Sequence, residues 1–235
     1  MGTPFDTAHG KLSIVATPIG NLEDITLRAL RTMKECDVIY AEDTRVIAKL
    51  LARYEIKKPL QRLDAATEIK KADEIIVRLE AGEHIALVSD AGTPGISDPG
   101  SRLVARVREQ VKMFNLFTKI EAIPGASALT AALSIAGLDA TNFTFLGFLP
   151  HKKGRQTALK KIALSEIPVI LYESPHRILK LLKELEVLEI SHVTIARELT
   201  KIHEEVVDGS PEEMLAHFTA HSEAVRGEFV VIVSS

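Results

Sequence analysis

Hydrophobic and polar positions alternate along the chain in the pattern that is typical of a mostly parallel β-sheet with crossover helices. Short apolar runs indicate strands, and the longer stretches between them indicate helices. The predicted strands cover residues 12–16, 38–41, 85–88, 119–123, 143–148, 169–172, 193–196 and 229–233. The predicted helices cover residues 26–34, 45–54, 66–80, 102–109, 127–136, 156–164, 177–185 and 211–219. The pattern predicts an α/β fold and leaves residues 111–117 unassigned.

The order of these elements indicates two α/β domains. A chain of 235 residues can form one large domain or two smaller ones, and a second series of strands and helices begins after the segment at 115–124. We therefore expect an N-terminal domain over residues 1–117 and a C-terminal domain over residues 118–235. Two domains of similar size would leave a cleft between them, which is a common place for a small-molecule site.

The segment 87–100 is rich in glycine and proline and follows a predicted buried strand. Ligands of open α/β sheets bind at this end of a strand, and Asp90 and Asp98 within the segment favour a binding site over a purely structural turn. The spacing of its last two glycines matches that of a phosphate-binding loop. However, Ser101 stands where such a loop needs its lysine, which argues against a nucleoside triphosphatase.

Small and polar residues also gather where later predicted strands end. These junctions lie at residues 123–132, 171–177, 196–205 and 226–228. In the first of them, backbone amides at the start of a helix could face an anionic or polar group. Close packing of a small-residue helix explains the same residues, so the sequence leaves both interpretations open.

The charge of the chain is nearly balanced, with 29 Lys and Arg against 32 Asp and Glu and a net charge of -3. This balance, together with the absence of Trp, argues against a protein that coats nucleic acid nonspecifically. Residues 141–165 nevertheless contain no acidic side chain. Five cations fall within that window: Lys152, Lys153, Arg155, Lys160 and Lys161. The window predicts either a local basic loop that meets RNA or an ordinary solvated surface.

The single cysteine, Cys36, excludes an intramolecular disulfide framework and a zinc site built from cysteines. It favours a reducing compartment, so we expect a cytoplasmic protein that holds no metal. The longest uncharged run, residues 122–138, is interrupted by proline and glycine and is shorter than the roughly 20 residues that a spanning helix needs. We therefore expect no membrane segment.

Five motifs together resemble the 16S rRNA cytidine-2'-O-methyltransferase branch of the tetrapyrrole methylase superfamily. They are IVATPIGNLEDIT at 14–26, AEDTR at 41–45, VSDAGTPGISDPG at 88–100, YESPHR at 172–177 and ARELTK at 196–201. The resemblance follows the same order from about residue 12 to residue 233. Five ordered motifs are far more specific than any one of them.

The resemblance implies two α/β domains of the class III methyltransferase type, with S-adenosylmethionine in the cleft between them and a homodimer as the assembly. Carried over position by position, it implies these cofactor-binding residues: Pro18, Asp90, Ala91, Gly92, Thr93, Gly125, Ser127, Ala128, Tyr172, Glu173, Ala196, Arg197 and Gly227. Each of them lies in a loop or at a predicted strand end.

The substrate implied by the resemblance is 16S rRNA within the small ribosomal subunit. The candidate substrate-binding residues are Asp43, Arg45, Lys152, Lys153, Arg155, His176, Arg177 and Lys201. A base that removes the proton of the 2'-hydroxyl would assist the transfer. The sequence does not choose this base among Asp43, Glu173, His176, Glu198 and Lys201.

The sequence therefore leaves three hypotheses about function. The leading hypothesis is 2'-O-methylation of a cytidine in 16S rRNA, on the assembled small subunit. The second is a methylase of the same fold that acts on a tetrapyrrole or another small molecule, against which the basic window and the AEDTR motif argue. The third is a noncatalytic ribosome assembly factor, against which the intact loop at 90–95 argues.

Overall fold

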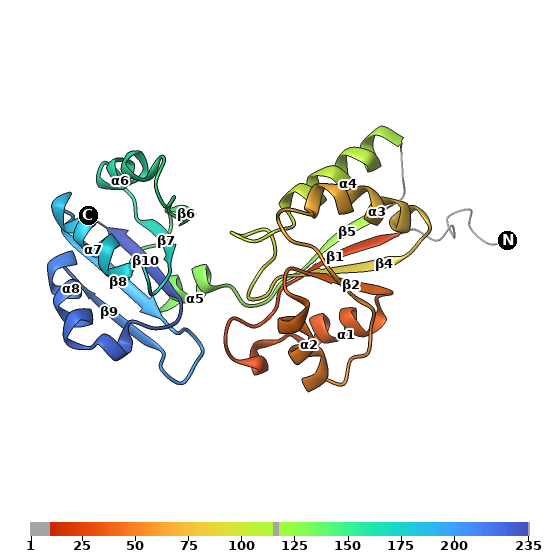
Figure 1. Cartoon of the computed structure of the whole chain (residues 1–235), viewed down its shortest axis with the longest axis horizontal. Coiled ribbons are helices and arrows are strands. Elements are labelled where there is room, and N and C mark those ends of the chain that lie inside the picture. The colour runs from red at the N-terminus through yellow and green to blue at the C-terminus, as the bar shows by residue number, and fades with distance from the viewer. Residues whose placement is uncertain (1–9, 115–117, 235) are drawn as a thin grey trace. The chain divides into compact units, whose positions relative to one another are not determined.

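The computed structural model describes residues 10–114 and 118–234 (Figure 1). The chain divides into two compact units, Met1–Ser127 and Ala128–Ser235, which we call the N-terminal unit and the C-terminal unit. Each unit has its own sheet and its own hydrophobic core.

The sheet of the N-terminal unit has the strand order β3-β2-β4-β1-β5, and its pairings are parallel. Its strands are β1 (Lys11–Val15), β2 (Val38–Ala41), β3 (Leu60–Arg62), β4 (His84–Val88) and β5 (Lys119–Ile123). Its helices are η1 (Leu22–Asp24), α1 (Leu27–Glu35), α2 (Thr44–Arg53), α3 (Glu68–Glu80) and α4 (Ser101–Phe114). A parallel sheet must be covered on both faces because each crossover helix lies on one of them.

Two separate clusters of buried side chains provide that cover. Helices α1 and α2 contribute to one cluster, which includes Met33, Ile47 and Val88. Helices α3 and α4 contribute to the other, which includes Ile75, Leu87 and Leu103. Helices α1 and α2 lie on one face of the sheet, and α3 and α4 lie on the other (Figure 1). Because side chains of successive strand residues alternate between the two faces, β2 and residues 85–88 of β4 are apolar throughout.

The sheet of the C-terminal unit is mixed, with the strand order β6-β7-β10-β8-β9. Its strands are β6 (Thr144–Phe148), β7 (Val169–Glu173), β8 (His192–Arg197), β9 (Glu205–Gly209) and β10 (Phe229–Ser234). Its helices are α5 (Ala128–Ile135), α6 (Arg155–Ala163), α7 (Ile178–Val187), α8 (Pro211–Ala220) and η2 (Ser222–Ala224). Strands β6 and β7 are parallel, whereas β10 runs antiparallel to both β7 and β8. The core includes Leu181, Leu185, Phe218 and Val231.

The α/β fold agrees with the hydrophobic pattern, but the pattern missed two strands. β3 has only three residues, and β9 is a half-buried edge strand without a continuous apolar run. Helix α4 extends to Phe114, beyond its predicted end at residue 109, and the unassigned residues 115–117 lie outside the described residues. Within residues 10–114 and 118–234, no helix is both long and apolar enough to cross a membrane.

The expected boundary between residues 117 and 118 differs from the observed division. β5 pairs in parallel with β1, with Lys119 opposite Lys11 and Ile123 opposite Val15, so it completes the first sheet. The division consequently falls after Ser127, at the start of α5. The hydrophobic pattern identified β5 as a strand but did not show with which sheet it pairs.

Candidate active site

The strand ends of the N-terminal unit meet at one edge of the parallel sheet. Val15, the last residue of β1, lies opposite Val88 at the end of β4 and Ile123 at the end of β5. The loops that follow these strands carry Pro18, residues 90–93, Gly125 and Ser127, which the sequence predicts to bind the cofactor. The structure therefore brings these cofactor-binding predictions together.

Backbone hydrogen bonds join the loop after β1 to the loop after β4. The Thr17 amide donates to the Gly92 carbonyl at 2.9 Å, and the Gly92 amide donates to the Thr17 carbonyl at 3.0 Å. The two hydroxyl groups beside them reinforce this pair, because Thr17 Oγ1 donates to the Ser89 carbonyl at 3.0 Å and Ser89 Oγ donates to the Gly92 carbonyl at 2.7 Å. These buried bonds fix the backbone of the loop without any charged group.

Gly92 occupies a position that disfavours any other residue. Its φ is +82°, in the left-handed region where a Cβ is strained. A Cβ there would lie 3.3 Å from Ile19 Cγ2 and 3.6 Å from the Ala126 carbonyl oxygen. The next residue, Thr93, donates its hydroxyl to the same Ala126 carbonyl at 3.3 Å. The loop after β4 thus touches the loops after both β1 and β5.

Asp90 and Asp43 connect a further strand end to this edge. The backbone amide of Asp43, which follows β2, donates to Asp90 Oδ1 at 2.9 Å. The Asp43 carboxylate caps α2 and binds the Arg45 guanidinium, with Nε to Oδ1 at 3.0 Å. Hydrogen bonds from the Arg45 side chain and backbone lower the pKa of Asp43 to about 2, so it is ionised at neutral pH and is a poor proton acceptor. The Arg45 side chain is exposed and can contact a partner.

Glu42 is a candidate that the sequence analysis did not single out. Glu42 directly follows Ala41, the buried last residue of β2. Burial raises the pKa of the Glu42 carboxyl, and the nearby negative charges of Asp90 and Asp64 raise it further. A raised pKa makes a carboxylate a better proton acceptor, and perturbed groups of this kind gather at functional sites. Its position directly after a predicted buried strand is the feature of the sequence that could have identified Glu42 as a candidate.

The strand ends of the C-terminal unit also share one edge. Phe229 at the start of β10 lies opposite Glu173 at the end of β7 and Arg197 at the end of β8. Arg197 in turn lies opposite Glu205 at the start of β9. Tyr172, Ala196 and Gly227 border the same edge, so the remaining cofactor-binding predictions other than Ala128, which begins α5, fall on this sheet edge.

Tyr172 connects this edge to the start of α5. Its hydroxyl accepts a hydrogen bond from the Leu129 amide at 3.2 Å, beside the predicted Ala128. Its ring lies edge-to-face against Phe145 and Phe148, with centroid separations of 5.0 and 5.6 Å. Two aromatic side chains of β6 therefore contact the Tyr172 ring.

Glu198 and Gly227 fit each other closely. Glu198 has a φ of +49°, and its carboxylate binds Lys201 Nζ at 2.8 Å. A Cβ on Gly227, whose φ is +77°, would overlap Glu198 Oε1 at 1.7 Å. Gly227 is thus required by the neighbouring side chain as well as by its own backbone. Nearby, Arg197 binds Glu205 at 2.5 Å.

The loop that joins β6 to α6, residues 149–154, is here called the basic loop. Its residues His151, Lys152 and Lys153 are exposed, as the sequence predicts for an RNA-facing segment. Arg155 contradicts the prediction, because its side chain is only 4% exposed and binds Glu184 Oε2 through Nη2 at 2.6 Å. Arg155 therefore does not belong to the exposed basic surface.

Arg177, another predicted substrate-binding residue, is also turned inward. Its Nε and Nη2 bind the two carboxylate oxygens of Glu173, each at 2.9 Å. The Glu173 side chain is fully buried. Among the base candidates, Asp43, Glu173 and Glu198 are each engaged by a cation, whereas His176 is exposed and lines a pocket with Gly227 and Arg226.

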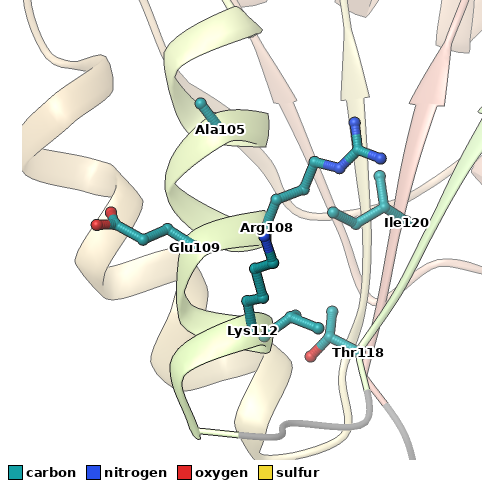
Figure 2. Close-up of a pocket in the computed structure, with 7 residues that line it drawn as sticks. Ala105, Arg108, Glu109, Lys112, Thr118 and Ile120 are labelled. Carbon is teal, nitrogen blue, oxygen red and sulfur yellow. The ribbon is translucent and has the colours of Figure 1, made fainter.

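Predicted site residues line some of the pockets, such as a pocket of about 560 Å³ in the N-terminal unit that includes Thr93. A pocket of about 700 Å³ between α4 and β5 is lined by Arg108, Lys112 and Ile120, but by none of the predicted site residues (Figure 2). The pocket that includes His176 and Gly227 has a volume of about 670 Å³. Within the described residues, no group of three or more His, Cys, Asp or Glu side chains is placed to hold a metal ion.

The fold matches that of solved methyltransferase structures. A crystal structure of diphthine synthase superposes with a TM-score of 0.71 at 16% identity and covers 96% of this chain and 90% of that chain. Uroporphyrin-III-C-methyltransferase from Thermus thermophilus superposes with a TM-score of 0.62 at 19% identity, covering 96% and 94%. The sequence model of the tetrapyrrole (corrin/porphyrin) methylases matches residues 11–215. The fold and the strand-end loops therefore define a methylase of this class.

Curated relatives narrow the assignment. Ribosomal RNA small subunit methyltransferase I of Thermotoga maritima is 44% identical over 96% of this chain and 98% of its own length. The protein of the same name from Synechocystis sp. is 44% identical over 96% of this chain and 79% of its own length. The chain belongs to the tetrapyrrole methylase family and, within it, to the family of ribosomal RNA small subunit methyltransferase I.

Proposed function

We propose that the protein is an S-adenosylmethionine-dependent methyltransferase that methylates the 2'-hydroxyl of a cytidine in 16S rRNA, with the assembled small subunit as its substrate. The observation that carries the proposal is 44% identity over 96% of the chain to an enzyme named for methylation of small-subunit ribosomal RNA. We further propose that it acts as a homodimer in the cytoplasm, where its substrate is found.

The loops at both sheet edges fit the chemistry of the proposed cofactor. S-adenosylmethionine presents an ammonium, a carboxylate, ribose hydroxyls and an adenine ring, which call for carboxylates, backbone amides and flat apolar contacts. Asp90 supplies a carboxylate, Ala91 and Thr93 are partly exposed on either side of the buried Gly92, and Tyr172 supplies an aromatic ring. The cofactor, when bound, supplies the activated methyl group.

The proposed cofactor-binding set is Pro18, Asp90, Ala91, Gly92, Thr93, Gly125, Ser127, Ala128, Tyr172, Glu173, Ala196, Arg197 and Gly227. The geometry of Glu173 refines its role, because its carboxylate is committed to Arg177 and is buried. Glu173 therefore supports the edge rather than contacting the ligand through its carboxylate.

The chain's own residues must position the nucleotide for an in-line attack on the methyl group. Positioning of this kind lowers a barrier by several kcal/mol, of order 7–11 kcal/mol in ideal cases. We propose Arg45, Lys152, Lys153, His176 and Lys201 as RNA contacts, with Asp43 orienting Arg45. Glu42 joins His176 as a candidate acceptor of the hydroxyl proton because its pKa is raised.

One assay separates this proposal from its alternatives. The protein is incubated with S-adenosylmethionine labelled in the methyl group and with small subunits, naked 16S rRNA or a tetrapyrrole precursor. We expect label in the small subunit, on a ribose that resists alkaline cleavage. Label in the tetrapyrrole alone would show a small-molecule methylase, and cofactor binding without transfer to any of the three would favour a noncatalytic assembly factor.

A further inference from the structure

Two arginines and two glutamates form a buried cluster beneath the basic loop. Arg155 and Glu184 have side chains that are 4% and 17% exposed, and those of Arg177 and Glu173 are 15% and 0% exposed. Charges this far from water are tolerated only when they pair and satisfy their hydrogen bonds. Both pairs are two-pronged, with Arg155 Nε and Nη2 lying 2.9 and 2.6 Å from Glu184 Oε2 and the Nε also 3.1 Å from Oε1.

Each arginine also holds the backbone of the basic loop. Arg177 Nη2 donates to the Leu149 carbonyl at 2.7 Å, and Arg155 Nη1 donates to the Pro150 carbonyl at 3.4 Å. Arg177 Nη1 lies 3.2 Å from His151 Nε2. Because Arg155 is itself the first residue of α6, the loop is tied to the cluster where it begins and where it ends.

The part of the loop between these ties is exposed and carries the cations. Lys152 and Lys153 are exposed, and the Lys152 carbonyl accepts the Arg155 amide at 3.2 Å to close the turn. Gly154 completes the turn with a φ of +89°. A loop whose stem is fixed in advance loses less conformational freedom when it binds a partner. The buried arginines thus fix the two ends of the basic loop, whereas Lys152 and Lys153 remain exposed to a partner.

We propose that Arg155, through Glu184, and Arg177, through Glu173, are positioning residues that hold the basic loop so that Lys152 and Lys153 meet RNA phosphates. This inference rests on the proposed function. In this arrangement neither arginine contacts RNA, and the sequence-based assignment of Arg155 and Arg177 to direct RNA binding is replaced by an indirect role.

The cleanest test is Glu184→Gln, with Glu186→Gln as its matched control. Glu186 lies on the same helix and is exposed. Each substitution therefore removes one negative charge from α7, and the two variants have the same net charge. Only Glu184→Gln weakens the tie to Arg155. We expect the KM for small subunits to rise about tenfold in Glu184→Gln relative to Glu186→Gln, the equivalent of roughly 1.4 kcal/mol. The kcat at saturating RNA and the Kd for S-adenosylmethionine should be unchanged.

The order of the loop is measured on the protein alone by trypsin, which cleaves after Lys152 and Lys153. We expect faster cleavage there in Glu184→Gln than in the Glu186→Gln control. Arg155→Lys is the second variant, which keeps the charge and loses the two-pronged geometry, and it should show the same two changes. Lys152→Gln/Lys153→Gln is the reference for direct contact and should lower the slope of log Kd against log salt by about 1.5.

Three results would overturn the proposal. A salt slope that falls by about 1 in Arg155→Lys would make Arg155 a phosphate contact. Equal KM values and equal cleavage rates in Glu184→Gln and Glu186→Gln would reduce the cluster to a stability element. Faster cleavage with an unchanged KM would show that loop order does not matter to RNA. Failure of the wild-type protein to methylate any RNA would instead refute the proposed function, whereas the cleavage rates would still test the cluster.

Discussion

The two sheet edges that carry the candidate site are built by different physical means. In the N-terminal unit, the loop after β4 is fixed by reciprocal backbone bonds between Thr17 and Gly92 and by the hydroxyl of Ser89. In the C-terminal unit, the corresponding edge is fixed by ion pairs, such as Arg177 with Glu173 and Arg197 with Glu205. Backbone hydrogen bonds thus fix the first edge, and ion pairs between side chains fix the second.

This difference predicts different tolerances. Backbone bonds survive most substitutions, but strain at a left-handed φ cannot be repaired by changing another side chain. Ion pairs are lost when one partner changes, since the remaining buried charge is left unpaired. Where a substitution clashes with a side chain, however, a second substitution that removes this side chain can restore part of the lost stability.

The largest effect is expected for Gly92→Ala. Its left-handed backbone and the contact with Ile19 force the loop to move, and the movement breaks the bonds to Thr17. We expect the Kd for S-adenosylmethionine, measured by calorimetry, to rise on the order of a hundredfold, or about 3 kcal/mol. Gly137→Ala is the control, because Gly137 has a φ of +68° and nothing within 4 Å of a Cβ. Equal affinities in the two variants would show that the loop does not depend on Gly92.

The second largest effect tests whether a destabilising substitution at the C-terminal edge can be compensated by a second substitution. Gly227→Ala places a Cβ against the Glu198 carboxylate, which must move and release Lys201. We expect the free energy of unfolding to fall by about 2 kcal/mol, of which about half is strain at a left-handed φ. In Gly227→Ala/Glu198→Ala the clash is absent, so about half of the loss should be recovered in urea denaturation. No recovery would mean that this edge is as dependent on its backbone as the N-terminal one.

The placement of these residues at strand ends could be predicted from the sequence because it follows from local pattern. A continuous apolar run such as β4, with glycine, proline and Asp90 directly after it, indicates a strand that ends in a binding loop. The same reasoning failed for β9, because an edge strand with one half-buried face has no such run. It also failed for the pairing of β5, which depends on a partner far away in sequence.

The roles of the charged residues could not be predicted, since each depends on a distant partner. Arg155 reads as part of a basic window, but Glu184, which is 29 residues away, buries it. Glu42 draws no attention beside Asp43, because its raised pKa arises from burial and from Asp90 and Asp64 on other loops. Local sequence shows where charge lies along the chain, and the fold decides whether it points outward or inward.

The smallest effect concerns a cluster of charged side chains around the middle of β5 in the N-terminal unit. Glu121 on β5 is bonded by Lys11, Lys119 and Ser13. Burial opposes its ionisation, but these hydrogen bonds outweigh burial and lower its pKa from 4.5 to about 2.

A carboxyl with a lowered pKa stabilises the fold above its unfolded pKa, and the stabilisation is lost as pH falls toward the folded value. We therefore expect wild type to exceed Glu121→Gln by about 1–2 kcal/mol in free energy of unfolding at pH 7, after allowance for the partial exposure of the group. The difference should shrink between pH 4.5 and pH 2. Denaturation at several pH values measures it, and a difference that stays constant with pH would show that Glu121 contributes packing rather than charge. Comparing Glu121→Gln with Gly92→Ala therefore separates a loss of charge pairing on the strands from a loss of backbone fit in the loop after β4.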